Sequence, residues 1–274
     1  MKNFIKSALM DEGIDLCVFL PLDRCTVTKQ YLLDKAGISH GFAVVLAIPY
    51  YTHACDNERN ISAYAVSRDY HHFVNLLSGK LIPKISEKFK NIKIAMFADH
   101  SPIDEREAAL KGGLGIMGRN NLLITEKYSS YVFLAELIVG EELEDGEYDL
   151  CEPRYCENCG ACTRACPWKK GECDECLSAI TQKKGELDEK QISLLKKYSL
   201  WGCDICTEIC PYTLRAKKSG SIYSQIEFFN QDTIALITHD TIAKMSDDEF
   251  SKRAFSWRGR DTILRNADIG EQDN

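Results

Sequence analysis

The stretch CENCGACTRACP, from Cys156 to Pro167, decides how this chain is interpreted, and a shorter run, CDICTEICP, follows from Cys203 to Pro211. The first run has the spacing C-x2-C-x2-C-x3-C-P and the second C-x2-C-x3-C-P. Most of the 13 cysteines lie between positions 151 and 210. In a chain of this length, such crowding indicates metal binding rather than the disulfide framework of a short secreted protein.

The first run has the spacing of bacterial ferredoxins, in which three thiolates hold one [4Fe-4S] cluster and the fourth binds a second cluster. Two such clusters need one cysteine more than the two runs contain, and either Cys173 or Cys176 can supply it. The predicted ligands are Cys156, Cys159, Cys162 and Cys210 for one cluster, and Cys166, Cys203, Cys206 and Cys173 or Cys176 for the other. The alternative is a four-cysteine zinc site, but zinc leaves the third cysteine of each run and both C-P endings unexplained.

The segments before these runs alternate between helix-like and strand-like patterns. Amphipathic spacing predicts helices, and short apolar runs bounded by Gly or Pro predict strands. The expected helices are 1–13, 62–89 with a restart after Pro83, and 104–115; the expected strands are 15–22, 43–51, 92–99 and 131–142. This alternation predicts an α/β (α+β) domain over 1–147, a cysteine module over 148–218 and a helical segment over 219–274. In the last segment, Ser246 and Glu249 form a predicted capping box.

Composition and charge exclude several classes of protein. The chain has 274 residues, 45% hydrophobic and 27% charged, as in ordinary globular proteins. Its net charge of -7 gives no global basic field for nucleic acid. The longest apolar run, GFAVVLAIPYY, is shorter than a membrane span, and the N-terminus lacks the apolar region of a signal peptide. We therefore expect a cytoplasmic protein with no membrane contact.

The segment ADHSPIDEREAALKGGLGIMGRNNLLIT, residues 98–125, resembles the epoxyqueuosine reductase family, cobalamin-dependent iron-sulfur enzymes related to reductive dehalogenases. The family has an aspartate at a strand end, followed by a Pro, an Arg, a GLG turn and a Gly-basic-Asn segment. Further similar segments follow in the family's order: AYAVSRDYHHF at 63–73, CLSAIT at 176–181, GCDICTEICPYT at 202–213 and FSWRGRDTILRNADI at 255–269.

The resemblance implies a nitroreductase-like, cobalamin-binding domain joined to a ferredoxin-like module with two [4Fe-4S] clusters. It favours Cys176 over Cys173 as the eighth ligand, because Cys176 begins the CLSAIT segment. It makes Asp99 the expected proton donor. The residues expected to line the corrinoid are Arg68, Tyr70, Asp99, Gly118, Arg119, Asn120 and Leu123.

The implied reaction is the reduction of epoxyqueuosine to queuosine in tRNA. Electrons from a flavodoxin or ferredoxin pass through both clusters to the corrinoid, and Asp99 protonates the departing oxygen. That role requires a pKa raised by desolvation from the usual value of about 3.9. Without the resemblance, an aspartate at a strand end is more often a turn or N-cap residue. His71 and His72, taken alone, are interpreted as ordinary surface or core histidines. The SWRGR segment, residues 256–260, is the best local candidate for a phosphate contact.

The chain departs from the family in three places. DHSP replaces the usual DSGP after the aspartate, the segment between Ile38 and Ala43 is short, and the helical repeats expected after the Arg-Asn segment are missing, so we expect a short form. Two other functions therefore stay open: a corrinoid iron-sulfur reductase of a small molecule, with dehalogenase-like chemistry, and a non-catalytic electron-transfer protein.

Overall fold

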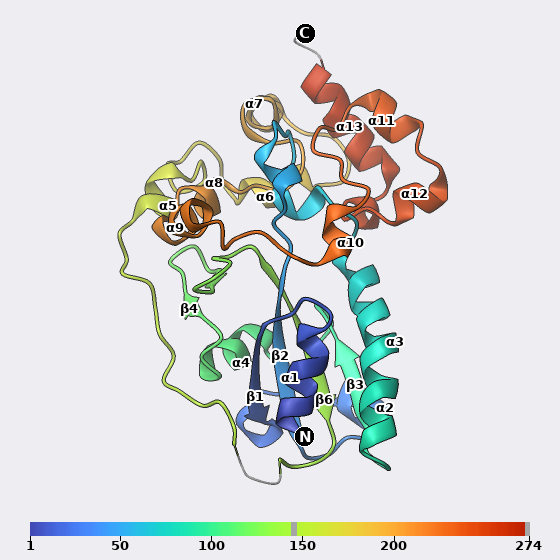
Figure 1. Cartoon of the computed structure of the whole chain (residues 1–274). Helices are drawn as coiled ribbons and strands as arrows, with labels where there is room; N and C mark the ends of the chain where they lie inside the picture. Colours follow the sequence, from blue (N-terminus) through green and yellow to red (C-terminus); the bar gives the residue numbers. More distant parts are fainter. Residues whose placement is uncertain (144–146, 272–274) are drawn as a thin grey trace. The chain divides into compact units, whose positions relative to one another are not determined.

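The computed structural model describes residues 1–143 and 147–271 and divides into two compact units (Figure 1). Unit 1 comprises Met1–Pro49 and Tyr70–Asn158, and unit 2 comprises Tyr50–Asp69 and Cys159–Asn274. Residues 50–69 thus group with the cysteine-rich part of the chain. The sequence-based boundaries after residues 147 and 218 stay predictions, and residues 144–146 of the acidic connection lie outside the described residues.

Unit 1 contains a four-stranded sheet with helices against it. Its helices are α1 (Lys2–Met10), η1 (Leu22–Arg24), α2 (Gln30–Ala36), α3 (Tyr70–Lys88) and α4 (Glu105–Lys111). Its strands are β1 (Leu16–Pro21), β2 (Phe42–Pro49), β3 (Ile94–Phe97), β4 (Ile116–Met117), β5 (Leu123–Ile124) and β6 (Val132–Val139). The predicted strands are all present, and β4 and β5 add a small hairpin within the glycine-rich segment.

The strand order is β1-β2-β6-β3, and every neighbouring pair is antiparallel. All eight residues of β2 are buried, as predicted for a central strand. A strand buried on both faces has no polar alternation, which explains its continuous apolar sequence. The fold is therefore α+β, with helices covering an antiparallel sheet.

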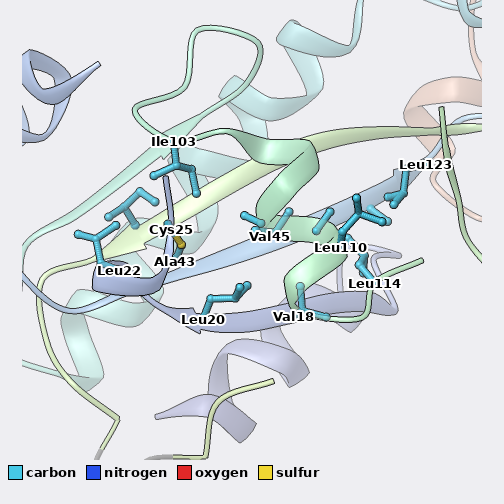
Figure 2. Packing of buried hydrophobic residues seen from close by; sticks show 14 of the residues in the cluster. Val18, Leu20, Leu22, Cys25, Ala43, Val45, Ile103, Leu110, Leu114 and Leu123 are labelled. Atoms are coloured by element: carbon cyan, nitrogen blue, oxygen red, sulfur yellow. The ribbon is translucent and has the colours of Figure 1, made fainter. Parts of the chain in front are cut away.

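Helix α4 packs across β1, β2 and β6 on one face of this sheet. Figure 2 shows Leu110 and Leu114 of the α4 segment against Val18, Leu20 and Val45 of the strands. This apolar cluster fixes where α4 begins, and so fixes the seven-residue connection from the end of β3.

Helix α3 packs against β3 and differs from the prediction in two ways. It begins at Tyr70, because residues 62–69 form a 3₁₀ turn (η3, Ala63–Ala65) and an irregular segment of unit 2. It also continues through Pro83 without a restart. Leu81 and Ile85 are buried on either side of the exposed Pro83, and this packing outweighs the missing backbone hydrogen bond.

Unit 2 is built from short helices. They are η2 (His53–Asp56), η3, α5 (Ala161–Ala165), α6 (Leu177–Thr181), α7 (Glu189–Tyr198), α8 (Ile205–Glu208), α9 (Pro211–Ser219), α10 (Glu227–Asn230), α11 (His239–Ala243), α12 (Asp247–Ser251), η4 (Ser256–Arg258) and α13 (Arg260–Glu271). The predicted capping box of Ser246 and Glu249 is confirmed at α12. Fully buried Asn266 of α13 donates to the carbonyls of Thr181 and Leu200, each at 2.7 Å. One side chain thus joins α13 to α6 and to the segment before the second cysteine run.

Among the described residues, none of the helices combines the length and the hydrophobicity that a membrane span requires.

Candidate catalytic and cluster sites

Asp99 lies two residues beyond the end of β3, in a left-handed backbone conformation with a φ of 56°. Its carboxylate Oδ2 is 3.4 Å from Nε2 of His71, in the first turn of α3. The Asp99 side chain is 66% exposed and that of His71 47%. A carboxyl and an imidazole group are therefore paired at an accessible surface of unit 1, where they can hold a proton between them.

The pKa of Asp99 is lowered from its ordinary value, first by a hydrogen bond from His71 and also by one from Tyr70, while partial burial opposes the shift. The sequence analysis expected the opposite direction, because it considered desolvation and could not place His71. Asp99 is thus a carboxylate at neutral pH in the free chain. A role as acid requires that its surroundings change when substrate covers it.

Tyr70 orients the pair formed by Asp99 and His71. Its ring stacks on Phe133 of β6, with ring centroids 4.1 Å apart and planes 10° apart. The Tyr70 ring is buried and hydrogen-bonds to Asp99. Arg68 belongs to unit 2, where its guanidinium lies 4.3 Å from the Phe228 ring and its Nε 3.6 Å from Asp232. The structure therefore places Tyr70 and Asp99 together, and gives Arg68 partners of its own.

The predicted corrinoid-lining residues 118–123 form the turn between β4 and β5. The amide of Gly118 donates to the Leu122 carbonyl at 2.9 Å, and the amide of Asn121 donates to the Gly118 carbonyl at 2.9 Å. A Cβ atom on Gly118 would lie 2.3 Å from Oδ1 of Asn120 and 3.1 Å from the Leu122 carbonyl oxygen. Only glycine fits this turn without movement of its neighbours. Leu123 is buried beneath it, while Arg119 is exposed.

The same turn is joined to the start of the first cysteine run. The Met117 amide donates to the Arg154 carbonyl at 2.8 Å, and the Cys156 amide donates to the Met117 carbonyl at 3.0 Å. The backbone amide of Arg119 then donates to Sγ of Cys156 at 3.3 Å. A sulfur that accepts an amide hydrogen bond has its negative charge stabilised, as at cluster ligands. The predicted corrinoid turn and the first predicted cluster ligand thus contact each other directly, through the Arg119 amide and the Cys156 sulfur.

The remaining predicted ligands lie in unit 2, at the ends of short helices. Helix α5 carries Cys162, helix α8 carries Cys206, and these two helices pack together. Cys176 is the N-cap residue of α6 and Cys210 that of α9, where Pro211 occupies the first turn. The Cys210-Pro211 ending is therefore a helix start. The Cys166-Pro167 ending differs, because Cys166 is the C-cap residue of α5 and turn residues follow it.

Cysteines of unit 2 lie close to one another in two places, around Cys203 and around Cys173. Burial, with the nearby Cys206 and Cys176, raises the pKa of the Cys203 thiol to about 12. Cys173 is 5% exposed, donates from Sγ to the Glu175 carbonyl at 3.2 Å, and lies near both Cys166 and Cys176. Cys176 is exposed. Cys176, Cys203 and Cys206 thus lie near one another, and Cys176 is more exposed than Cys173. Their assignment to one cluster, with Cys176 as the eighth ligand, stays a prediction.

The chemistry of these side chains fits iron-sulfur clusters. In the described part of the chain, none of the eight predicted ligands is in a disulfide bond. Among the described residues, no three His, Cys, Asp or Glu side chains converge on a single ion position. A cubane makes no such demand, since each of its four thiolates binds a different iron atom.

The sequence analysis missed Asp204, between the first two cysteines of the second run. Its carboxylate accepts from Nη2 of Arg59 at 3.0 Å, from the Ser62 hydroxyl at 2.5 Å and from the Ala63 amide at 2.7 Å. Arg59 also binds Glu208 in α8. These contacts fasten residues 59–63 to the loop of Cys203 and Cys206. Ion pairing across 145 residues leaves no signal in spacing or periodicity.

None of the family models compared with the sequence matches it. Curated relatives do: the chain is 31% identical to the epoxyqueuosine reductase of Gloeobacter violaceus over 206 residues, covering 71% of this chain and 62% of that protein. It is 30% identical to the enzyme of Cellulophaga algicola over 222 residues, covering 76% and 69%. For the Aliivibrio fischeri enzyme the values are 31% identity and coverage of 77% and 55%.

Among solved structures, the epoxyqueuosine reductase of Streptococcus thermophilus superposes with a TM-score of 0.76 at 23% identity, covering 98% of this chain and 80% of that one. The α+β unit with a cysteine-rich helical unit is therefore the architecture of that class of proteins. The chain belongs to the epoxyqueuosine reductase family. The matched segment spans 62% and 55% of the Gloeobacter and Aliivibrio proteins.

Proposed function

We propose that this chain reduces epoxyqueuosine to queuosine in tRNA, the activity for which its relatives are named. The pairing of Asp99 with His71 at the end of β3 carries the proposal, because it offers a proton at an accessible site. The reaction consumes two electrons and two protons: the epoxide loses its oxygen as water and an alkene forms. The chain must therefore receive electrons and deliver protons at one place.

The eight cysteines named above would hold two [4Fe-4S] clusters, and the turn at 118–123 with Tyr70 and Asp99 would contact cobalamin. When bound, these groups supply one-electron transfer at low potential and a metal centre for the substrate carbon. A turn that leaves little room for a Cβ atom at Gly118 suits close approach of a flat macrocycle.

Proton delivery would fall to the chain's own residues. In the free chain Asp99 is ionised, and its proton partner is His71. Substrate that covers the exposed Asp99 removes water from it, which raises its pKa and favours transfer of the shared proton to the carboxylate. Asp99 would then protonate the departing oxygen, and Tyr70 would keep its carboxylate oriented.

The substrate would be recognised locally, because the net charge of -7 gives no global attraction to tRNA. A relative at 22% identity was solved with an epoxyqueuosine-modified tRNA stem loop. In the SWRGR segment, the Arg260 guanidinium donates hydrogen bonds to the Ile242 carbonyl and to the Asp247 carboxylate. Trp257 is 57% exposed, with the Arg258 guanidinium 3.9 Å from its ring centroid. Exposed Trp257 and half-buried Arg258 together would suit stacking on a base and contact with a phosphate.

Electrons would enter at Cys176. This exposed residue lines a hollow of about 640 Å³ in unit 2 that also contains Lys183 and Lys184. Glu175, which pairs with Lys183, and Arg258 line the same hollow, so its rim carries a net positive charge. A net positive rim beside a cluster ligand suits an acidic electron carrier such as a flavodoxin or ferredoxin.

The test is anaerobic purification with added cobalamin, followed by iron and cobalt analysis and turnover of a tRNA stem loop that carries epoxyqueuosine. We expect about eight iron atoms and one cobalt per chain. Asp99→Asn should abolish turnover while both metals stay bound, and the control Asp34→Asn, at an exposed position of α2, should behave as wild type. An Asp99→Asn variant that still turns over would remove Asp99 from the mechanism. A fully loaded wild type without turnover would refute the substrate.

A further inference from the structure

Glu136, in the middle of β6, is a carboxyl group buried inside an apolar cluster. It is 0% exposed. Its cross-strand partners are Val45 of β2, which belongs to the cluster packed under α4, and Phe97 of β3, which packs against that cluster. Directly paired residues point to the same face of a sheet, so Glu136 faces α4. An ionised carboxylate in such surroundings is costly unless a charge or a donor compensates it.

The group that meets Glu136 is a second carboxyl, Glu105, the first residue of α4. Both side-chain oxygens of Glu136 and Oε2 of Glu105 are buried, and among the described residues no donor of ordinary hydrogen-bond geometry compensates them, although the Ser101 hydroxyl lies close to Glu136. Two ionised carboxylates cannot hydrogen-bond to each other. A single proton between them converts one oxygen into a donor and satisfies the pair.

The surroundings favour that proton. Burial first, and then the charge of Glu105, raises the pKa of Glu136 to about 9, and burial also raises the pKa of Glu105. Other charged or titratable groups around the pair are Asp99, Asp104, Arg106 and, beyond η1, Cys25. Of these only Arg106 is positive, and β2 and β3 contribute the apolar Val45 and Phe97. The Ser101 hydroxyl partly offsets the rise at Glu136.

Ser101 and Glu105 lie at two points of the connection that carries Asp99. Ser101 is 3% exposed, two residues after Asp99, and its Oγ accepts from the Ile103 amide at 3.2 Å. Glu105 closes the connection at α4, whose N-cap is Asp104. Both residues turn toward the same buried carboxyl of β6. The segment 99–105 is therefore held at two positions by one buried residue of the sheet, Glu136.

We propose that Glu136 and Glu105 share one proton at neutral pH and that this acid pair, with Ser101, holds segment 99–105 so that Asp99 stays in place against His71. Glu136 and Glu105 are positioning residues in this proposal. The link to catalysis rests on the proposed function, whereas the shared proton and the fixed segment do not.

The test uses the whole chain, with Glu136→Gln and, as a matched control, Glu126→Gln at an exposed position of the same unit. Difference infrared spectra should contain the carbonyl band of a protonated carboxyl at pH 7, which disappears as the pH is raised past about 9. Glu136→Gln should remove the band and Glu126→Gln should keep it. If Glu136→Gln does not fold, Glu105→Gln serves in its place, because it leaves Glu136 without its carboxyl partner and should shift the pH at which the band disappears.

Hydrogen exchange of the amides of segment 99–105, corrected for intrinsic pH dependence, reports the positioning. In wild type, protection should fall by about tenfold over the pH range in which the band disappears, as for the loss of one hydrogen bond. Glu136→Gln should keep its protection across that range. In the enzyme loaded with its clusters and cobalamin, the turnover rate should decline over the same alkaline pH range in which the band disappears.

The proposal would be overturned if the band is absent at pH 7. It would also be overturned if the protection of segment 99–105 changes neither with pH nor with the Glu136→Gln substitution. Infrared and exchange need no substrate, so these outcomes are independent of turnover. Failure of the proposed function would instead appear as an inactive wild type with an intact band.

Discussion

Asp204 is the position at which one substitution should test the architecture of the cysteine-rich unit most directly. Replacing it with alanine removes the acceptor for Arg59, Ser62 and the Ala63 amide together. The Arg59 and Asp204 side chains are only 14% and 12% exposed, so the guanidinium loses its charge partner in a poorly solvated place. Glu208 remains as a second, more exposed partner.

The magnitude follows from these contacts. Removing one member of a buried ion pair costs about 3 to 5 kcal/mol. Because Glu208 still compensates Arg59, we take the lower end, about 3 kcal/mol of unfolding free energy. The loop between Cys203 and Cys206 loses its attachment to residues 59–63 at the same time. We therefore also expect a lower iron content after anaerobic reconstitution.

The assay is urea unfolding of Asp204→Ala, followed by circular dichroism, with iron analysis of the same samples. The matched control is Asp240→Ala, which removes an aspartate from the exposed pair with Lys244 in α11. That control should leave the unfolding midpoint at the wild-type value, since exposed pairs contribute little. If Asp204→Ala unfolds at the same urea concentration as Asp240→Ala and retains full iron, the reasoning is refuted.

Three further results are expected. Cys176→Ser should lose iron, whereas Cys173→Ser should keep the wild-type iron content; equal losses would contradict the choice of eighth ligand. Gly118→Ala should weaken cobalamin binding, measured by absorbance titration, because its Cβ would meet Asn120 and Leu122, while Gly79→Ala in α3, with no atom near the new methyl group, should bind normally. The unfolding free energy should decrease as the pH rises from about 4.5 toward 9, because Glu136 binds its proton more tightly in the folded chain than in the unfolded one. Chemical unfolding at several pH values should detect this slope in wild type and a smaller one in Glu136→Gln; identical slopes would contradict the raised pKa.

Several features of this protein were determined by the sequence alone, because they depend on neighbours along the chain. The apolar run at β2 predicts a central strand, and the eight residues are buried. The Ser246–Glu249 spacing predicts a capping box that the structure contains. The cysteine spacing and the segment around Asp99 indicate the family, which the curated relatives confirm. Such signals survive in one dimension since turns, caps and ligand runs span only a few residues.

Other features were decided only by the tertiary structure. His71 gave no signal as a functional residue, yet folding places it 3.4 Å from Asp99 and reverses the expected direction of the Asp99 pKa shift. Glu136 and Glu105 lie far apart in sequence, and only the packing of α4 on the sheet brings their carboxyl groups together. Asp204 meets Arg59 across 145 residues. Electrostatic pairing and desolvation depend on distances through space, and no local pattern of residues encodes them.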